Sequence, residues 1–272
     1  MSLLLKVLLT GVLLLITCQV MASDQVTNPA LGRIFQDADV NGTFVLYDAS
    51  GDYFTIHDQL RAEQRFIPAS TFKIPNSLIG LASGAIEDVD DVLPYGGKPQ
   101  FIEAWERDMG LREAIRISNV PIYQELARRI GLQRMSEYVN LLNYGNGNIG
   151  ERVDMFWLEG PLKISAIEQS RFMARLGNQA LPLSKQVQES VHDILEIDRG
   201  HDWVLYAKTG WGTASETAVG WWVGWVEKQG HIYSFALNMD MPDLSDAAKR
   251  QELGRACLEA LAIIGNRNHV QH

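Results

Sequence analysis

Cysteine and histidine are scarce in this sequence, and neither is arranged for metal binding. The chain has 2 cysteines, Cys18 and Cys257, and 6 histidines without a His-x-x-x-His pair, so we expect no metal site. Cys18 lies in the apolar N-terminal stretch, and once that stretch is removed Cys257 has no partner for an internal disulfide. Positive charge is also in deficit, with a net charge of −9. This charge argues against nucleic acids and anionic membranes as partners.

Long apolar runs are absent after the N-terminus. Lys6 precedes an almost wholly apolar stretch, Val7–Ile16, and a small-x-small sequence follows at Val20–Ala22. This pattern is typical of a cleaved secretory signal. We therefore expect residues 1–22 to be a signal peptide and the remaining 272 − 22 = 250 residues to be a periplasmic protein without a membrane anchor. Thr17-Cys18 leaves lipoprotein processing open as an alternative.

The rest of the chain has strand-rich ends and a helical middle. Aromatic and β-branched residues predict strands near both ends, and apolar residues at i, i+3 and i+4 predict helices between them and at the C-terminus. The expected strands are 42–48, 53–57, 203–208, 218–227 and 231–239. One expected helix begins near Pro68. The others cover 101–109, 111–117, 122–130, 133–142, 166–177, 183–195 and 244–264.

This order predicts an α/β fold of the α+β type. We expect an antiparallel sheet built from both chain ends, flanked by helices, with an inserted helical lobe. Residues 23–272 would form one domain of two lobes, which the length allows. The sheet lobe would take about 23–65 and 200–272, and the helical lobe about 66–199.

Gly145–Gly150 matches the G-x-G-x-x-G pattern of dinucleotide sites, but its surroundings do not suit one. Such a site needs a strand before the motif and a helix after it. Here the motif follows an expected helix and leads into more loop. We interpret it as a turn.

Ser70 and Lys73 stand at a spacing of i, i+3 in the stretch Pro68–Asn76. On a helix these positions are neighbours, so the Lys73 side chain can reach the Ser70 hydroxyl. Pro68 suits a helix start, which places Ser70 near free backbone N–H groups and the positive end of the helix dipole. A nucleophilic serine requires an alcohol, a base and oxyanion donors together. Alone, the pair could equally be a helix cap and a solvated lysine.

Other blocks decide between these interpretations. They are Ser118-Asn119-Val120, Tyr144-Gly145-Asn146, Phe156-Trp157-Leu158-Glu159-Gly160 and Lys208-Thr209-Gly210, with further similarity through Trp221–Glu227 and Asn238–Asp240. Together with Ser-x-x-Lys they resemble the penicillin-recognising serine enzymes. Within that group the chain is similar to the class D, oxacillinase-type β-lactamases over nearly its whole length after residue 22.

The resemblance implies a role for each catalytic residue. Ser70 would form an acyl-enzyme with the β-lactam, and the backbone N–H groups of Ser70 and Trp211 would form the oxyanion hole. Ser118 would pass a proton to the departing lactam nitrogen, and Lys208 would keep that network polarised. A helix-ending hydroxyl is the structural alternative for Ser118.

The resemblance also implies a substrate site. Thr209 and Arg250 would hold the substrate carboxylate, because a guanidinium matches a carboxylate fork. Arg255 is an alternative to Arg250. Gly210, Val120 and Leu158 would complete the substrate-binding surface.

Class D enzymes use a lysine carbamate as general base, so Lys73 would take up CO₂; no other cofactor is expected. Phe72, Val120, Trp157 and Leu158 can supply an apolar pocket that favours neutral Lys73. Trp157 can donate its indole N–H to the carbamate. We assign no base role to Glu159, because it lacks the Glu–Asn pattern of another β-lactamase class.

Two other functions share these motifs. One is a D-alanyl-D-alanine peptidase acting on cell-wall peptides, and the other is an antibiotic sensor that stays acylated. Both are usually tethered or carry further domains. A small-molecule β-lactam is therefore the expected partner, whereas substrate breadth and oligomeric state cannot be predicted from the sequence.

Overall fold

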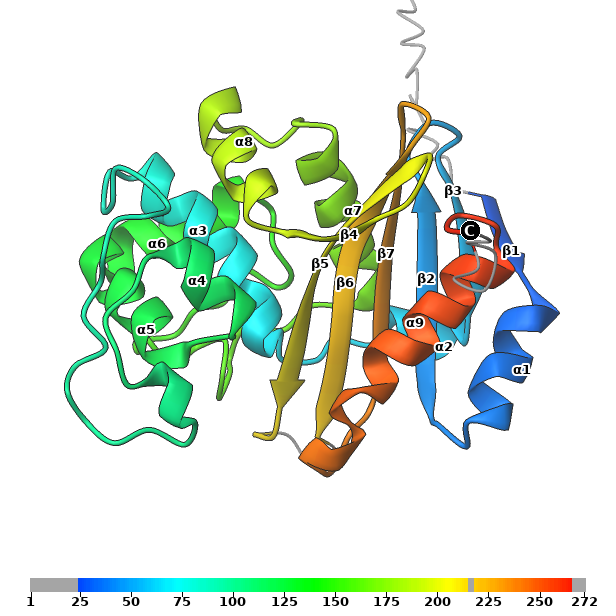
Figure 1. The fold of residues 1–272 in the computed structure, drawn as a ribbon, viewed down its shortest axis with the longest axis horizontal. Coiled ribbons are helices and arrows are strands. Elements are labelled where there is room, and N and C mark those ends of the chain that lie inside the picture. Colours follow the sequence, from blue (N-terminus) through cyan, green and yellow to red (C-terminus); the bar gives the residue numbers. More distant parts are fainter. Residues whose placement is uncertain (1–23, 215–217, 266–272) are drawn as a thin grey trace, which may run out of the picture.

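The computed structural model describes residues 24–214 and 218–265, so the expected signal peptide at 1–22 lies outside the described residues. Within them, a seven-stranded sheet with the order β1-β3-β2-β7-β6-β5-β4 forms the centre (Figure 1). Strands β1 and β3 are parallel, and the other neighbours are antiparallel. The strands are β1 (Asp24–Thr27), β2 (Gly42–Asp48), β3 (Tyr53–His57), β4 (Glu196–Arg199), β5 (Trp203–Gly212), β6 (Val219–Lys228) and β7 (His231–Asp240).

Helices cover both faces of the sheet. In Figure 1, α3, α4, α5, α6 and α8 gather to the left of the sheet, whereas α1 and α9 lie together at the right. α7 packs directly on β2, β6 and β7. The helices are α1 (Pro29–Asp37), α2 (Gln59–Glu63), α3 (Lys73–Ala82), α4 (Leu111–Arg116), α5 (Val120–Ile130), α6 (Leu132–Leu141), α7 (Ala166–Gly177), α8 (Lys185–Asp193) and α9 (Lys249–Ala260).

Strand β6 shows how one sheet serves two cores. Its side chains alternate between the faces, as in any strand: Trp221 and Val223 belong to the core beneath α7 and the helical region, whereas Trp222 belongs to the core beneath α1 and α9. Because both faces are covered, the strand is almost continuously apolar. The two cores hold α1 and α9 on one face and the helical region on the other.

Side-chain caps set the helix starts on which the site depends. Asn119 accepts from the Ile122 N–H at the start of α5, where Pro121 follows. Ser165 and Glu168 form a reciprocal capping box at the start of α7. Each cap satisfies backbone donors that the first helical turn leaves unpaired.

The predicted antiparallel sheet from both chain ends is confirmed, because β2 pairs with β7 along its length. The helix predicted over 101–109 is wrong: only Glu103–Trp105 form a 3₁₀ turn, η2. At the end of this segment, Met109 exchanges two backbone hydrogen bonds with Leu93, at 3.1 and 3.2 Å, so its backbone groups are bonded to another segment and not within a helix. The helix predicted over 244–264 shortens to α9, preceded by the 3₁₀ turn η3 (Leu244–Ala247).

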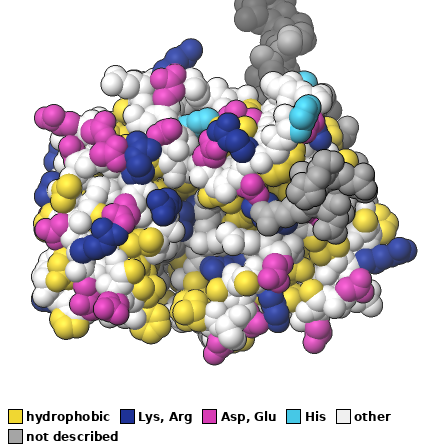
Figure 2. All heavy atoms as spheres, in the orientation of Figure 1, with side chains coloured by type: hydrophobic (Ala, Val, Ile, Leu, Met, Phe, Trp, Pro, Cys, Tyr) yellow, Lys and Arg dark blue, Asp and Glu magenta, His cyan; other side chains and the backbone are white. Residues whose placement is uncertain are grey.

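Charged side chains of both signs are mixed on the surface. On the face shown in Figure 2, acidic and basic side chains are interspersed. No helix within the described ranges is long and apolar enough to cross a membrane. The same ranges contain no cluster of three potential metal-binding side chains among His, Cys, Asp and Glu. Cys257 is buried, which raises the pKa of its thiol to about 12.

The Gly145–Gly150 stretch is a turn, as predicted, and it ties α6 to the loop before α7. Asn146 N–H donates to the Lys163 carbonyl at 2.9 Å, and Lys163 N–H donates to Asn146 Oδ1 at 3.1 Å. Gly145 has φ +57°, and a Cβ there would overlap the Lys163 carbonyl oxygen. Glycine is therefore required by both conformation and space.

Gly145→Ala should lower the free energy of unfolding by more than the left-handed conformation alone costs. Gly84 is the matched control, because it has φ +70° and nothing lies within 4 Å of the place that an alanine methyl group would take. We expect about 1–2 kcal/mol for Gly84→Ala and more, about 2–4 kcal/mol, for Gly145→Ala. Urea unfolding measures both. Equal losses would contradict the overlap with Lys163.

Candidate active site

Ser70 and Lys73 meet where the 3₁₀ turn η1 (Ala69–Phe72) passes into α3. Lys73 Nζ donates to Ser70 Oγ at 2.8 Å, so the predicted contact is present. Ala69 holds φ +48°, a left-handed conformation uncommon for residues with a side chain. The backbone is thus strained one residue before Ser70, a feature often found at functional sites.

Lys73 is fully buried, and its Nζ lies 5.4 Å from the centre of the Tyr123 ring. Burial, followed by repulsion from Lys208, lowers the pKa of Lys73 well below its usual value. None of the lysine ion pairs found among the described side chains involves Lys73. A buried lysine without a counter-ion favours the neutral amine, which can accept a proton from a neighbouring hydroxyl.

Ser118 and Lys208 form a second serine–lysine pair. Ser118 lies in the turn between α4 and α5 with φ +59°, and Lys208 lies on β5. Lys208 Nζ donates to Ser118 Oγ at 2.7 Å and to the Thr209 carbonyl at 3.0 Å. Burial, and then the nearby Arg250, lower the pKa of Lys208 to about 7. Near neutral pH this pair can therefore either hold or release a proton.

Gly210 lets β5 approach the turn that carries Ser70. A Cβ on Gly210 would lie 3.1 Å from the Pro68 carbonyl oxygen and 3.1 Å from Thr71 Cγ2. Most side chains would push the strand away from η1. The short distance brings Thr209 and Trp211 to the same cavity as Ser70.

The two candidate arginines lie in different surroundings. Arg250 lines the cavity beside Ser70, and its Nη1 donates to the Gly210 carbonyl at 2.6 Å. Burial lowers the pKa of Arg250 to about 10. Arg255 instead pairs with Asp198 at 2.8 Å and lies over the Trp222 ring, in the core beneath α9. The geometry favours Arg250 over Arg255 for a bound carboxylate.

A cavity of about 200 Å³ brings most of the predicted site residues together. The predicted residues that line it are Ser70, Ser118, Val120, Leu158, Thr209, Gly210, Trp211 and Arg250. Three predicted residues do not line it, and all three are buried: Lys73, Trp157 and Lys208.

Four apolar lining residues escaped the sequence analysis: Phe101, Ile102, Trp105 and Leu244. Phe101 is 80% exposed although it is large and apolar, which is typical of a binding surface. The Trp105 ring is fixed by its Nε1, which donates to the Ile117 carbonyl at 3.0 Å. Phe101, Ile102 and Trp105 were missed because their apolar spacing was interpreted as that of a helix over 101–109.

Trp157 lies next to the Ser70 turn. Its carbonyl accepts from Ala69 N–H at 3.0 Å, and its ring stacks on Phe72 with centroids 5.5 Å apart. Its Nε1 is buried without a hydrogen-bond partner among the described atoms. Burying a donor without a partner costs free energy of folding, so the Trp157 indole N–H is well suited to donate to an acceptor that binds beside it.

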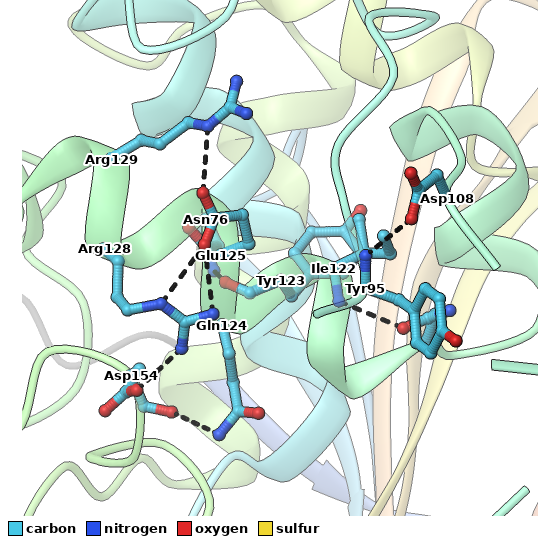
Figure 3. Close-up of polar contacts among 11 residues, drawn as sticks. Asn76, Tyr95, Asp108, Ile122, Tyr123, Gln124, Glu125, Arg128, Arg129 and Asp154 are labelled. Atoms are coloured by element: carbon cyan, nitrogen blue, oxygen red, sulfur yellow. Dashed lines mark hydrogen bonds and ion pairs between the residues drawn. The ribbon is translucent and has the colours of Figure 1, made fainter. Parts of the chain in front are cut away.

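Helix α5 anchors the segment that leads to Trp157 (Figure 3). Arg128 lies between Glu125 and Asp154, with Nη1 donating to Asp154 Oδ2 at 2.9 Å. Gln124 Nε2 donates to the Asp154 carbonyl at 3.1 Å. Because Val120 begins α5, the same helix positions one wall of the cavity and the approach to Trp157.

Glu159 points away from this chemistry. Its carboxylate pairs with Arg152 at 2.8 Å, and its side chain is 51% exposed. The site offers Lys73, not Glu159, as the group in contact with Ser70.

Comparison with known proteins identifies the family. Residues 24–259 match the family described as penicillin binding protein transpeptidase domain. The crystal structure of FUS-1 (OXA-85), a class D β-lactamase from Fusobacterium nucleatum subsp. polymorphum, is similar with a TM-score of 0.85 and 44% identity, over 88% of this chain and 100% of that one. The chain belongs to the class D β-lactamases.

Curated relatives agree with this placement. Beta-lactamase OXA-5 of Pseudomonas aeruginosa is 43% identical over 240 residues, which cover 87% of this chain and 90% of that protein. Beta-lactamase OXA-48 of Klebsiella pneumoniae is 39% identical, over 87% of this chain and 89% of that protein. The predicted resemblance is confirmed: this class D β-lactamase is a β-lactam hydrolase. The relatives therefore favour hydrolysis over the peptidase and sensor alternatives.

Ser70→Ala should abolish turnover of a chromogenic cephalosporin and leave no covalent adduct with penicillin, because the attacking oxygen is gone. Wild-type enzyme should turn over many equivalents, whereas a protein that stays acylated would give one stoichiometric burst. Intact-mass spectrometry checks the adduct. A penicilloyl group on the Ser70→Ala protein would contradict the assignment of Ser70.

Arg250→Ala should raise KM more than it lowers kcat, because a carboxylate clamp binds ground state and transition state alike. A charge-assisted contact is worth about 1.5–3 kcal/mol, or roughly ten- to a hundredfold in affinity. Arg255→Ala is the matched control on the same helix and should leave KM nearly unchanged. Steady-state kinetics with penicillin separates the two, and the reverse pattern would show that Arg255 holds the carboxylate.

Proposed function

We propose that this class D β-lactamase acts in the periplasm on penicillin-type substrates, through an acyl-enzyme on Ser70 and a carbamate on Lys73. The observation that carries the proposal is the fully buried Lys73, which contacts Ser70 Oγ at 2.8 Å. Its lowered pKa favours the neutral amine, and CO₂ reacts only with a neutral amine. The apolar stretch and small-x-small sequence within residues 1–22 support export.

The surroundings of Lys73 fit a carbamate. Trp157 Nε1 is a buried donor without an acceptor among the described atoms, and the Trp157 ring stacks on Phe72, the neighbour of Lys73. Leaving such a donor unpaired costs about 1–3 kcal/mol, and an anionic group beside Lys73 would offset that cost. When present, the carbamate supplies an oxygen base for the proton of Ser70 and later for that of water.

Ser70 Oγ would attack the lactam carbonyl carbon, forming the acyl bond as the lactam C–N bond breaks. The leaving nitrogen needs a proton, which Ser118 can give because Lys208 Nζ donates to Ser118 Oγ. Backbone N–H groups of Ser70 and Trp211 would stabilise the oxyanion. Water then cleaves the ester and frees Ser70.

Arg250 and Thr209 would hold the substrate carboxylate, with Lys208 nearby. Burial, and then repulsion from Arg250, lower the pKa of Lys208, and an anion between Lys208 and Arg250 would weaken that repulsion. Substrate would therefore raise the Lys208 pKa and keep a proton on the lysine when the leaving nitrogen needs one. Phe101, Ile102 and Trp105 offer an apolar surface for the side chain of a penicillin.

Activity should depend on bicarbonate and decline in acid. The Lys73 amine is neutral above its lowered pKa and charged below it, so protonation as the pH falls releases CO₂ and removes the base. Added bicarbonate should restore turnover at mildly acidic pH, and ¹³C NMR with labelled bicarbonate should show a carbamate signal. An active enzyme with no such signal and no bicarbonate effect would contradict the proposal.

Trp157→Phe sharpens this test, because it keeps a ring to stack on Phe72 and removes only the indole N–H. It should weaken the carbamate signal, raise the bicarbonate requirement and let acyl-enzyme accumulate. Trp222→Phe is the matched control, since Trp222 Nε1 is also buried without a described partner but lies in the core beneath α9. Equal effects of the two substitutions would assign the loss to packing.

A further inference from the structure

A second cavity lies at the end of the sheet opposite to the active site. It has a volume of about 460 Å³ and lies between α7 and the turns that join β2 to β3 and β6 to β7. Figure 1 shows both turns at the upper end of the strands. Lys228, beside the second turn, pairs with Trp203 at the start of β5, whereas Thr209 to Gly212 lie at the other end of that strand. The cavity is therefore separate from the site that contains Ser70.

Arg175, near the end of α7, is the distinctive group in this cavity. It is half-buried, and its Nη1 donates to the Leu142 carbonyl at 2.9 Å. It forms no ion pair among the described side chains, and burial lowers its pKa. A partly desolvated cation without a counter-ion is unfavourable unless something supplies the negative charge.

Arg250 in the active site is held in a similar way. Each guanidinium donates from Nη1 to a main-chain carbonyl, each has a pKa lowered by burial, and each lines a cavity. Arg250 is the more deeply buried of the two and also donates from Nε to the Ala247 carbonyl at 2.9 Å. The carbonyl fixes one edge of the planar fork and leaves other N–H donors for a ligand. In Arg250 this arrangement suits a carboxylate, and the physical reason applies equally to Arg175.

The other walls define the body of the ligand. Tyr47, Ala174, Ala180 and Ile232 supply apolar surface, and the Tyr47 ring is held by stacking on Phe54 with centroids 4.5 Å apart. The volume falls in the range of about 300–1,000 Å³ typical of small-molecule sites. Apolar walls that include an aromatic ring suit an anion with a flat apolar body better than a hydrated inorganic ion.

The charged residues that line the cavity favour an anion. Arg171 lines it together with Arg175, and no aspartate or glutamate is among the described residues that line it. Two acids of the β2–β3 turn have partners of their own: Asp52 accepts from the Tyr47 hydroxyl at 2.9 Å, and Asp48 accepts from Ser50 Oγ at 2.6 Å.

We propose that this cavity binds a small organic carboxylate with a flat apolar body, and that Arg175 pairs with its carboxylate. Such a ligand would bind independently of catalysis. The site is thus a second carboxylate site in the same chain, in addition to the one proposed at Arg250.

Naphthoate, added at millimolar concentration to the full folded enzyme, is a suitable probe, and naphthamide is its neutral counterpart. Amide proton–nitrogen correlation NMR should show saturable shifts at Ala49, Ala180 and Gly230 with naphthoate only. Arg175→Gln should weaken this binding about tenfold or more, and turnover of a chromogenic cephalosporin should stay unchanged. Ala180→Phe, which fills the cavity and keeps Arg175, should abolish the same shifts.

The active site serves as the internal comparison, because Thr209 and Trp211 report binding beside Arg250. Shifts confined to those two amides would overturn the proposal, as would equal binding of naphthamide at the second cavity. Unchanged binding in Arg175→Gln would also overturn it and leave Arg175 as a structural link to Leu142. If Arg175→Gln does not fold, Ala180→Phe and naphthamide decide the matter.

Discussion

The burial of Lys73 without a counter-ion is the constraint on which the rest of the site depends. A lysine on the surface would stay charged and could not act as a base at neutral pH. Here the helical region, the Tyr123 ring and the Phe72–Trp157 stack exclude water from the amine. The packing around Lys73 therefore keeps its amine out of water and in contact with Ser70.

Keeping the lysine dry requires two distant segments to meet at the Ser70 turn. The segment with Trp157 is joined to it by the Ala69–Trp157 backbone bond, and β5 approaches from the other side at Gly210. One segment comes from the helical region and the other from the sheet. The active site is therefore the junction between these parts of the fold, and any change that separates them hydrates Lys73.

The sequence predicted the parts of this arrangement that have local causes. Ser70 with Lys73 follows from helical spacing, and the β6–β7 hairpin follows from its aromatic strands and glycine turn. The motif set also predicted Ser118, Lys208 and Arg250, because recognised blocks carry long-range information that periodicity lacks.

What escaped prediction has long-range causes. Phe101 and Trp105 lie in a segment that ends in a backbone pair between Met109 and Leu93 and not in a helix. The short strands β1 and β4 exist only because a neighbouring strand offers them partners. The cavity beside Arg175 likewise depends on two turns and a helix that are far apart in the chain.

The pairing of β2 with β7 has a consequence for how the chain is made. Gly42 lies beside Met239, so the centre of the sheet cannot close until almost the whole polypeptide has been synthesised. Until then β2 presents an unpaired edge, and contacts of such large sequence separation form slowly. The active site is also assembled late, because Lys208 and Thr209 lie on β5 and Arg250 lies on α9.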